Sequence, residues 1–326
     1  MTELYNNLYR RVSLSRLLEI SNSPLAVHMN HMSIGFDHFG THESHRMESS
    51  TSLYEKDLAG VLPLCLARLH NIKALNLRTP SPYIAGTTAE GVINTVARIL
   101  CYVPLPNLSE LEIEFPTTLG FDLLFPITTS ALQIPIDQVM RRLRHINISI
   151  VPNWPESPSD HLAFPDKSHT KHMFKLIEYA TSLRSLSISG SAPTPLPLDH
   201  IKFPQSLRLR YLNFNAVSIS LSNLLSLVNQ CADCIEYITC WSVTLNSGDW
   251  QHFLSRLCQL RPPDLLNVFV HSCGYSRTGE SSHLAPTVTP PYGDELDTET
   301  QNDGDIRVLA TLERQVRANR AAAGLN

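Results

Sequence analysis

A short hydrophobic phrase recurs along the chain. It consists of an apolar residue, two spacers, a second apolar residue, one spacer and a third apolar residue, as in Ile72, Leu75 and Leu77. The final apolar-x-apolar step has a period of two, which predicts a short strand with two side chains facing inward. Copies of the phrase end at Ile34, Leu77, Ile113, Ile148, Ile188, Phe214, Cys240 and Val270.

Apolar residues spaced by three and four positions occupy the segments between the phrases. This spacing places them on one face of a short amphipathic helix. The groups are Val92, Val96 and Ile99; Phe174, Ile177 and Leu183; Leu221, Leu224, Leu225 and Val228; and Phe253, Leu254 and Leu257. Strands that alternate with helices predict parallel strands joined by crossovers.

The distances between successive phrases predict a repeat of uneven length. They are 43, 36, 35, 40, 26, 26 and 30 residues, whereas leucine-rich repeats have about 20–29 residues. Each repeat can bury its apolar face only against its neighbours, so the repeats must stack. We therefore expect an α/β fold: an irregular leucine-rich-repeat-like solenoid with a parallel strand array on the inner face and helices and loops outside.

Several segments interrupt the repeats. The stretch 40–52 is polar and has no periodicity, which predicts a loop. The stretches 151–169 and 191–204 each contain four prolines, which disfavour the interior of a helix or strand.

The pattern divides the chain into three parts. Residues 1–275 are expected to form the solenoid, and the acidic segment 276–305, rich in Thr, Pro and Ser, a flexible linker. Residues 306–326 predict a C-terminal amphipathic helix, with Ile306, Leu309, Leu312 and Val316 on one face. This helix could cap the last repeat or dock elsewhere.

Composition narrows the class of protein. The 326 residues are 43% hydrophobic, which suffices for a large core, and the net charge of -4 gives no field that attracts nucleic acid or an anionic membrane. The N-terminal region has no signal-peptide pattern, and no apolar run reaches the roughly 18 residues of a membrane span. We expect a cytoplasmic or nuclear protein that binds neither nucleic acid nor membranes, with its seven cysteines reduced.

Residues 221–275 carry a more specific motif. Val243, Leu245, Gly248 and Trp250 precede a helical pattern of Phe253, Leu254 and Leu257. This combination resembles the late repeats of fungal F-box proteins, and residues 13–34 resemble the stretch that follows the F-box in that family. In that family the F-box would precede Leu17, and the residues before Leu17 do not match its motif.

The resemblance implies a substrate-recognition region of a ubiquitin-ligase adaptor. Its implied partners are an unidentified target protein and, where an F-box is supplied upstream, the Skp1–cullin ligase machinery. A stand-alone repeat scaffold without a ligase role is the alternative.

Histidines and carboxylates cluster near the first strand and raise a second alternative, a metal-dependent enzyme. The cluster comprises His28, His31, Asp37, His38, His42, Glu43 and His45. Such groups could bind zinc, but His42 and His45 lack the spacing of a zinc-protease helix. A polar loop, with His28 and His31 on the first strand, is the simpler interpretation.

Other chemistry-bearing motifs are incomplete. Cys231 and Cys234 form a CxxC without a suitably spaced second pair, which predicts buried structural thiols. The acidic segment 297–305 is similar to a calcium loop only in composition, because Ala310 stands where the bidentate glutamate is needed. The sequence contains no phosphate loop and no nucleophile elbow. We therefore expect that the protein binds no metal and no cofactor, has no catalytic residue and is not an enzyme.

The period of two also predicts which strand residues face solvent. These residues are acidic or basic in the early strands, with Arg78, Glu112 and Glu114. Near the C-terminal end they are aromatic, with Trp241 and Phe269, and Tyr211 and Tyr237 precede two of the strands. Aromatic side chains often anchor protein partners, so these seven residues are the candidate partner-binding positions.

Overall fold

The structure is a computed structural model. It describes residues 11–34, 48–78, 87–115, 118–125, 133–150, 167–191, 195–277, 280–282 and 303–325. The chain divides into two compact units, Met1–Thr181 and Ser182–Asn326.

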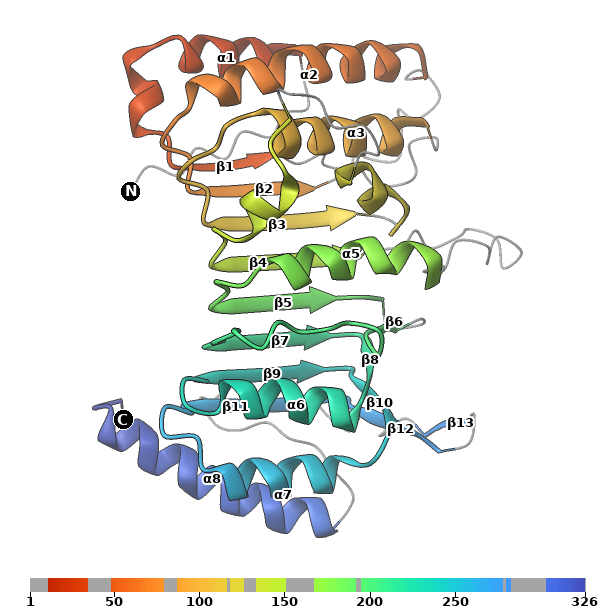
Figure 1. The fold of residues 1–326 in the computed structure, drawn as a ribbon, viewed down its shortest axis with the longest axis vertical. Helices are drawn as coiled ribbons and strands as arrows, with labels where there is room; N and C mark the ends of the chain where they lie inside the picture. Colours follow the sequence, from red (N-terminus) through yellow and green to blue (C-terminus); the bar gives the residue numbers. More distant parts are fainter. Residues whose placement is uncertain are drawn as a thin grey trace. The chain divides into compact units, whose positions relative to one another are not determined.

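Unit 1 alternates helices with parallel strands (Figure 1). Its strands are β1 (His31–Ile34), β2 (Ala74–Arg78), β3 (Glu110–Phe115) and β4 (His145–Ile150). Its helices are α1 (Arg11–Ser21), η1 (Pro24–His28), α2 (Glu48–Arg68), α3 (Thr87–Tyr102), η3 (Leu119–Leu124), α4 (Ile136–Met140) and α5 (Lys167–Tyr179).

The recurring phrase sets the register of the unit 1 strands. Ile34 lies beside Leu77, Leu77 beside Ile113, and Ile113 beside Ile148. All four side chains are buried, with exposed fractions of 1–3%. The prediction of parallel strands that share one apolar row is therefore confirmed in this unit.

The start of each strand is fixed by the same hydrogen bonds. The amides of Ser109 and Glu110 both donate to the carbonyl of Lys73, and those of Arg144 and His145 both donate to Ser109. Because one carbonyl holds two successive amides of the next repeat, the strands begin in step.

Two expectations for unit 1 are wrong. Helix α2 begins at Glu48, inside the stretch 40–52 that was expected to be a loop; residues 40–47 lie outside the described part. The helix continues through Pro63, although proline lacks the N–H that would bond to the preceding turn. His28 ends the 3₁₀ helix η1 instead of lying on the first strand, because Ser23 caps that helix and Pro24 opens it.

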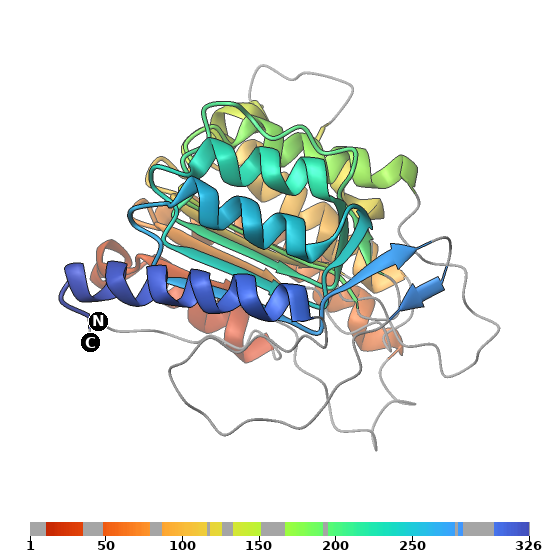
Figure 2. The same ribbon diagram turned by 90° about the horizontal axis from the view of Figure 1, so that it is seen from below.

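Unit 2 contains two sets of parallel strands (Figures 1 and 2). The first set is β5 (Ser185–Ser189), β7 (Tyr211–Asn215), β9 (Tyr237–Trp241) and β11 (Asn267–His271). The second is β6 (Leu196–Pro197), β8 (Val217–Ser220), β10 (Thr244–Ser247) and β12 (Gly274–Arg277), with β13 (Glu280–Ser282) antiparallel to β12. The helices are α6 (Leu221–Cys231), α7 (Trp250–Leu260) and α8 (Asp303–Ala322).

The phrase sets the register in unit 2 as well. Ile188 lies beside Phe214, Phe214 beside Cys240, and Cys240 beside Val270. These side chains are at most 5% exposed. Helices α6 and α7 run along one face of these strands (Figure 2), so the alternate side chains of the strands point to the opposite face.

We call the strands of the first set the main strands. A sharp corner links β7, β9 and β11 to their partners β8, β10 and β12 in the second set. Ala216, Ser242 and Ser272 follow β7, β9 and β11, and all three have positive φ angles, of 48°, 51° and 52°. The amide of Ala216 donates to Trp241 and that of Ser242 donates to His271. The same corner is therefore repeated, and each copy is bonded to the next.

The second strand set was not expected. Pro197 lies in β6, in the middle of the proline-rich stretch 191–204 that was expected to exclude strands. A two-residue strand at the edge of a sheet tolerates proline because an edge residue need not donate an amide. The expected solenoid ended at position 275 and the expected C-terminal helix began at position 306. In the structure, β12 extends to Arg277 and α8 begins at Asp303.

The motif that resembles F-box proteins has a structural explanation. Gly248 has a φ angle of +76°, and a Cβ there would lie 2.4 Å from the Leu221 side chain. Trp250 is 3% exposed, and its indole nitrogen donates to the Gly274 carbonyl at 3.0 Å. Gly248 thus packs against Leu221 at the start of α6, and Trp250 bonds to the carbonyl at the start of β12.

Helix α8 packs beside α7 (Figure 1). Leu312 and Val316, from the face predicted to be apolar, are 0% and 2% exposed. The side-chain amide of Asn319 donates to the carbonyls of Pro262 and Leu265, which precede β11. The helix thus covers the last repeat of unit 2.

Candidate partner-binding surface

The outward side chains of the main strands in unit 2 form a grid, which we call the unit 2 face. Its rows are in register across β5, β7, β9 and β11. The twelve residues are Ser185, Ser187, Ser189, Tyr211, Asn213, Asn215, Tyr237, Thr239, Trp241, Asn267, Phe269 and His271. None of them is Asp, Glu, Lys or Arg, so the face carries no fixed charge.

Tyr211 and Tyr237 begin neighbouring strands and stack on each other. Their ring centroids are 4.9 Å apart and the ring planes differ by 7°. This distance matches the spacing of about 4.8 Å between strands, so the rings stand side by side across β7 and β9. One face of Tyr211 is therefore covered by Tyr237, and its other face is turned toward Ser185 on β5.

A second aromatic group lies at the other end of these strands. The Trp241 ring lies 5.7 Å from the Phe269 ring and 4.7 Å from the His271 ring. Both neighbouring rings belong to β11. Because β9 lies between β7 and β11, the exposed part of Trp241 lies on the side of β7. Trp241 is 47% exposed and Tyr211 is 41% exposed, which is unusual for large aromatic side chains.

Charged side chains border the unit 2 face next to Tyr211. Arg210 and Glu236 form an ion pair at 3.4 Å. Burial raises the pKa of Tyr211 above its ordinary value of 10.0, and the Glu236 carboxylate raises it further because it disfavours a nearby phenolate. Tyr211 is therefore a neutral hydrogen-bonding phenol across the physiological pH range.

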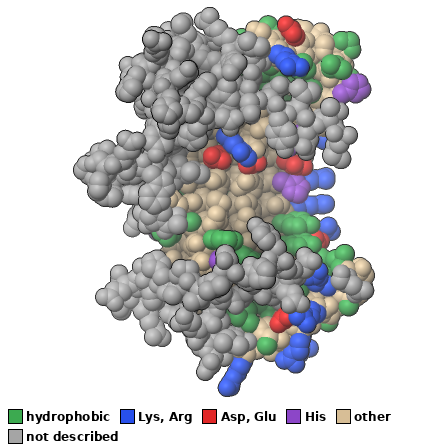
Figure 3. Space-filling view, turned by 180° about the vertical axis from the view of Figure 1, so that it is seen from behind, with side chains coloured by type: hydrophobic (Ala, Val, Ile, Leu, Met, Phe, Trp, Pro, Cys, Tyr) green, Lys and Arg blue, Asp and Glu red, His purple; other side chains and the backbone are tan. Residues whose placement is uncertain are grey.

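The rest of the unit 2 face is small and polar. The Asn213 side-chain amide donates to the Ser187 hydroxyl at 3.1 Å. Serine and threonine hydroxyls and asparagine amides can both donate and accept hydrogen bonds. Figure 3 shows the face turned away from the helices, where tan polar side chains lie next to green hydrophobic ones.

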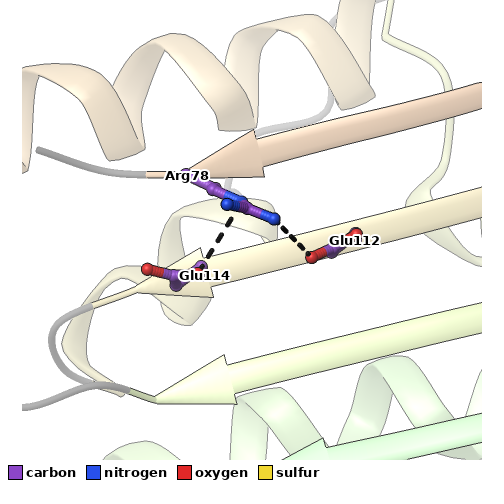
Figure 4. Close-up of polar contacts among 3 residues, drawn as sticks. All are labelled: Arg78, Glu112 and Glu114. Atoms are coloured by element: carbon purple, nitrogen blue, oxygen red, sulfur yellow. Dashed lines mark hydrogen bonds and ion pairs between the residues drawn. The ribbon is translucent and has the colours of Figure 1, made fainter. Parts of the chain in front are cut away.

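Unlike the unit 2 face, the outward surface of unit 1 includes charged side chains on β2 and β3. Arg78 on β2 lies between two carboxylates of β3, with Nη2 3.5 Å from Glu112 Oε1 and Nε 3.8 Å from Glu114 Oε2 (Figure 4). The three side chains are 52%, 33% and 36% exposed, so solvent screens the pairs and each contributes little to stability.

Two asparagines flank Glu112 in the same row of unit 1. Asn76 lies beside Glu112 on one side and Asn147 on the other. The Oδ1 atoms of both are buried and accept no hydrogen bond from the described residues. Glu110 begins β3 and is exposed. This part of the surface is rich in hydrogen-bond acceptors.

The structure therefore brings the candidate residues into three groups. Tyr211 joins Tyr237, Trp241 joins Phe269, and Arg78 joins Glu112 and Glu114. His271 was not one of the seven candidate positions, yet its ring joins the group of Trp241 and Phe269. Its ring lies 5.7 Å from Phe269; the period of two gave its direction, but only the strand register could give this contact.

The other candidate chemistry receives no support from the described residues. His31 begins β1, whereas Asp37, His38, His42, Glu43 and His45 lie outside the described part. Among the described residues, no group of three or more His, Cys, Asp or Glu side chains could hold a metal ion. The cysteines are free thiols; of the CxxC pair, Cys231 is buried as predicted, whereas Cys234 is only half-buried.

Comparison with family models and with curated proteins finds no relative. The chain matches no family model, and no curated protein is significantly similar to it. No helix in the described part of the chain is long and apolar enough to cross a membrane.

Proposed function

We propose that this chain is a leucine-rich-repeat-like solenoid that binds another protein through the outward side chains of its main strands. The strand register supports stacked repeats, since equivalent apolar positions of the phrase share one row in each unit. The repeated corner at Ala216, Ser242 and Ser272 supports the same interpretation.

The observation that carries the proposal is the exposure of Tyr211 and Trp241 on the unit 2 face. Exposed tyrosine and tryptophan side chains contribute large contact areas and lose little conformational entropy on binding. Both rings are already fixed by neighbouring rings. A partner would therefore meet pre-ordered side chains, which lowers the entropic cost of association.

The test is affinity capture with the purified full chain and a variant that carries Tyr237→Ala and Trp241→Ala. We expect one set of proteins to be captured by the original chain and lost from the variant, as measured by quantitative mass spectrometry. Thermal unfolding of both proteins shows whether the variant is still folded. Capture of the same proteins by the folded variant would contradict the proposal.

A matched control removes an exposed apolar side chain elsewhere. Leu64 on α2 is 58% exposed, so Leu64→Ala changes the exposed hydrophobic area without touching the strands. This variant should capture the same proteins as the original chain.

Recruitment of the bound protein to a ubiquitin ligase is the finer form of this proposal. It is supported by the resemblance of residues 221–275 to fungal F-box proteins. Co-purification with the Skp1–cullin machinery in a Trp241-independent manner would support it. Partner capture without any ligase component would favour a stand-alone scaffold.

A further inference from the structure

The unit 2 face has features that restrict which partner it can take, and this inference rests on the proposed function. We infer that the face binds an extended, uncharged segment of a partner protein, with two apolar side chains four residues apart packed against Tyr211 and Trp241.

The absence of fixed charge determines the first property of the segment. None of the twelve outward residues is Asp, Glu, Lys or Arg. A charged side chain of the partner would lose water on binding and find no opposite charge on the face, which costs free energy. An uncharged segment avoids this cost.

The polar residues of the face determine the second property. Asn213 and Thr239 lie side by side between the two aromatic groups, and Ser187 lies beside Asn213. These side chains both donate and accept hydrogen bonds. An extended peptide backbone presents N–H and C=O groups in alternation, so it can satisfy them along its whole length.

The positions of the rings determine the third property. Tyr211 lies beside Tyr237, and Trp241 is four residues further along β9. At about 3.3 Å per residue, the two exposed rings are about 13 Å apart along the strand direction. In an extended segment, side chains four residues apart lie on the same face at this same spacing.

The free surfaces of both rings are turned the same way. Tyr237 covers one face of Tyr211, and His271 and Phe269 lie on the β11 side of Trp241. The remaining surfaces are therefore turned toward the smaller residues Ser185 and Asn215 on the preceding strands. Two apolar side chains of the segment would lie over these small residues, each against one ring.

The test is a selection of random 12-residue peptides displayed on phage against the immobilised full chain. We expect the selected peptides to have apolar or proline residues at positions i and i+4, with no Asp, Glu, Lys or Arg between them. A synthetic peptide of this kind should bind about tenfold more weakly to Tyr211→Ala and to Trp241→Ala. Moving one apolar residue by one position should have a similar effect, because alternate side chains of an extended segment face opposite sides.

Two variants at one exposed position test the charge argument. Asn213→Asp and Asn213→Lys should both weaken binding of the synthetic peptide. If Asn213→Asp strengthened binding while Asn213→Lys abolished it, the segment would be cationic and the inference would be wrong. Leu64→Lys introduces a charge on α2, where the side chain is 58% exposed, and is the matched control that should leave peptide binding unchanged.

The outcomes separate this inference from the proposed function. Selected peptides that depend on Trp241 but are charged, or lack the four-residue spacing, would overturn the inference and leave the proposed function standing. Peptides that bind equally well to Tyr211→Ala and Trp241→Ala would count against both. Trp241-dependent binding of neutral hexasaccharides, such as cellohexaose or chitohexaose, without any peptide binding would overturn the choice of a protein segment.

Discussion

The rings of Tyr211 and Tyr237 lie parallel on neighbouring strands, with centroids 4.9 Å apart. Aromatic pairs of this kind contribute about 0.5–1.5 kcal/mol beyond the area that they bury. Because Tyr211 is 41% exposed, we expect a coupling near the lower end, about 0.5 kcal/mol. The measurement is a double-mutant cycle with Tyr211→Ala and Tyr237→Ala in urea unfolding. Strictly additive effects would show that the two rings do not interact in solution.

The corner at Ser272 predicts a stabilising substitution. Its φ angle of 52° lies in the left-handed region, which costs a residue with a Cβ about 1 kcal/mol. Ser272 is exposed, so Ser272→Gly loses little packing and should raise the free energy of unfolding by about 0.5–1 kcal/mol. Ser272→Val, which is β-branched, should lower it. A destabilising Ser272→Gly would show that the corner is held by the serine side chain.

Two glycines are expected to respond in opposite directions to alanine. Gly248 has a φ angle of +76°, and its added Cβ would lie 2.4 Å from Leu221. Gly248→Ala should therefore destabilise the protein by about 1–3 kcal/mol. Gly60 lies within α2, and nothing lies within 4 Å of its added Cβ, so Gly60→Ala should stabilise the protein by up to about 1 kcal/mol. Chemical unfolding of the two variants measures both effects, and a change of the same sign in both would contradict this account.

The main strands could be predicted from the sequence because each copy of the phrase contains three apolar residues at fixed spacing. The second strand set could not, since strands such as Val217–Ser220 contain only two inward residues and follow the first strand after a single corner residue. Helix α2 was not among the predicted helices, and its start at Glu48 lies in a polar stretch that was expected to be a loop. Periodicity measures only the contrast between buried and exposed positions, and it has no signal where a helix begins with polar residues.

The direction of the candidate side chains could also be predicted, whereas their contacts could not. Arg78 and Trp241 were both assigned to outward positions from the period of two. That Arg78 lies between Glu112 and Glu114 depends on the register of β2 against β3. Register is fixed by hydrogen bonds between repeats that are far apart in sequence, such as that from Glu110 to Lys73.

The buried thiols predict a loss of stability in alkaline solution. Burial raises the pKa of Cys231 from 9.0 to about 11. Below pH 9 the thiol is protonated in both the folded and unfolded states, but between pH 9 and 11 only the unfolded state loses the proton. The free energy of unfolding should therefore fall as pH rises through this window, by up to about 1.4 kcal/mol per unit for one thiol.

Urea unfolding between pH 8 and 11 measures this dependence. Cys231→Ala removes the group and should show a shallower decline than the original chain, whatever its starting stability. Equal slopes for the two proteins would show that Cys231 ionises equally readily in the folded and unfolded states.

Helix α8 carries a fully buried side chain whose removal should destabilise unit 2. Leu312 is 0% exposed, and the helix that carries it packs on α7 and bonds through Asn319 to the carbonyls before β11. Leu312→Ala should lower the free energy of unfolding by about 2–5 kcal/mol, because it removes buried methyl groups and leaves a cavity. The exposed neighbour Arg307 provides the control, since Arg307→Ala should change stability by less than about 0.5 kcal/mol. If Leu312→Ala unfolds at the same urea concentration as the control, α8 does not pack against α7 in solution. The core of unit 2 would then be complete without α8.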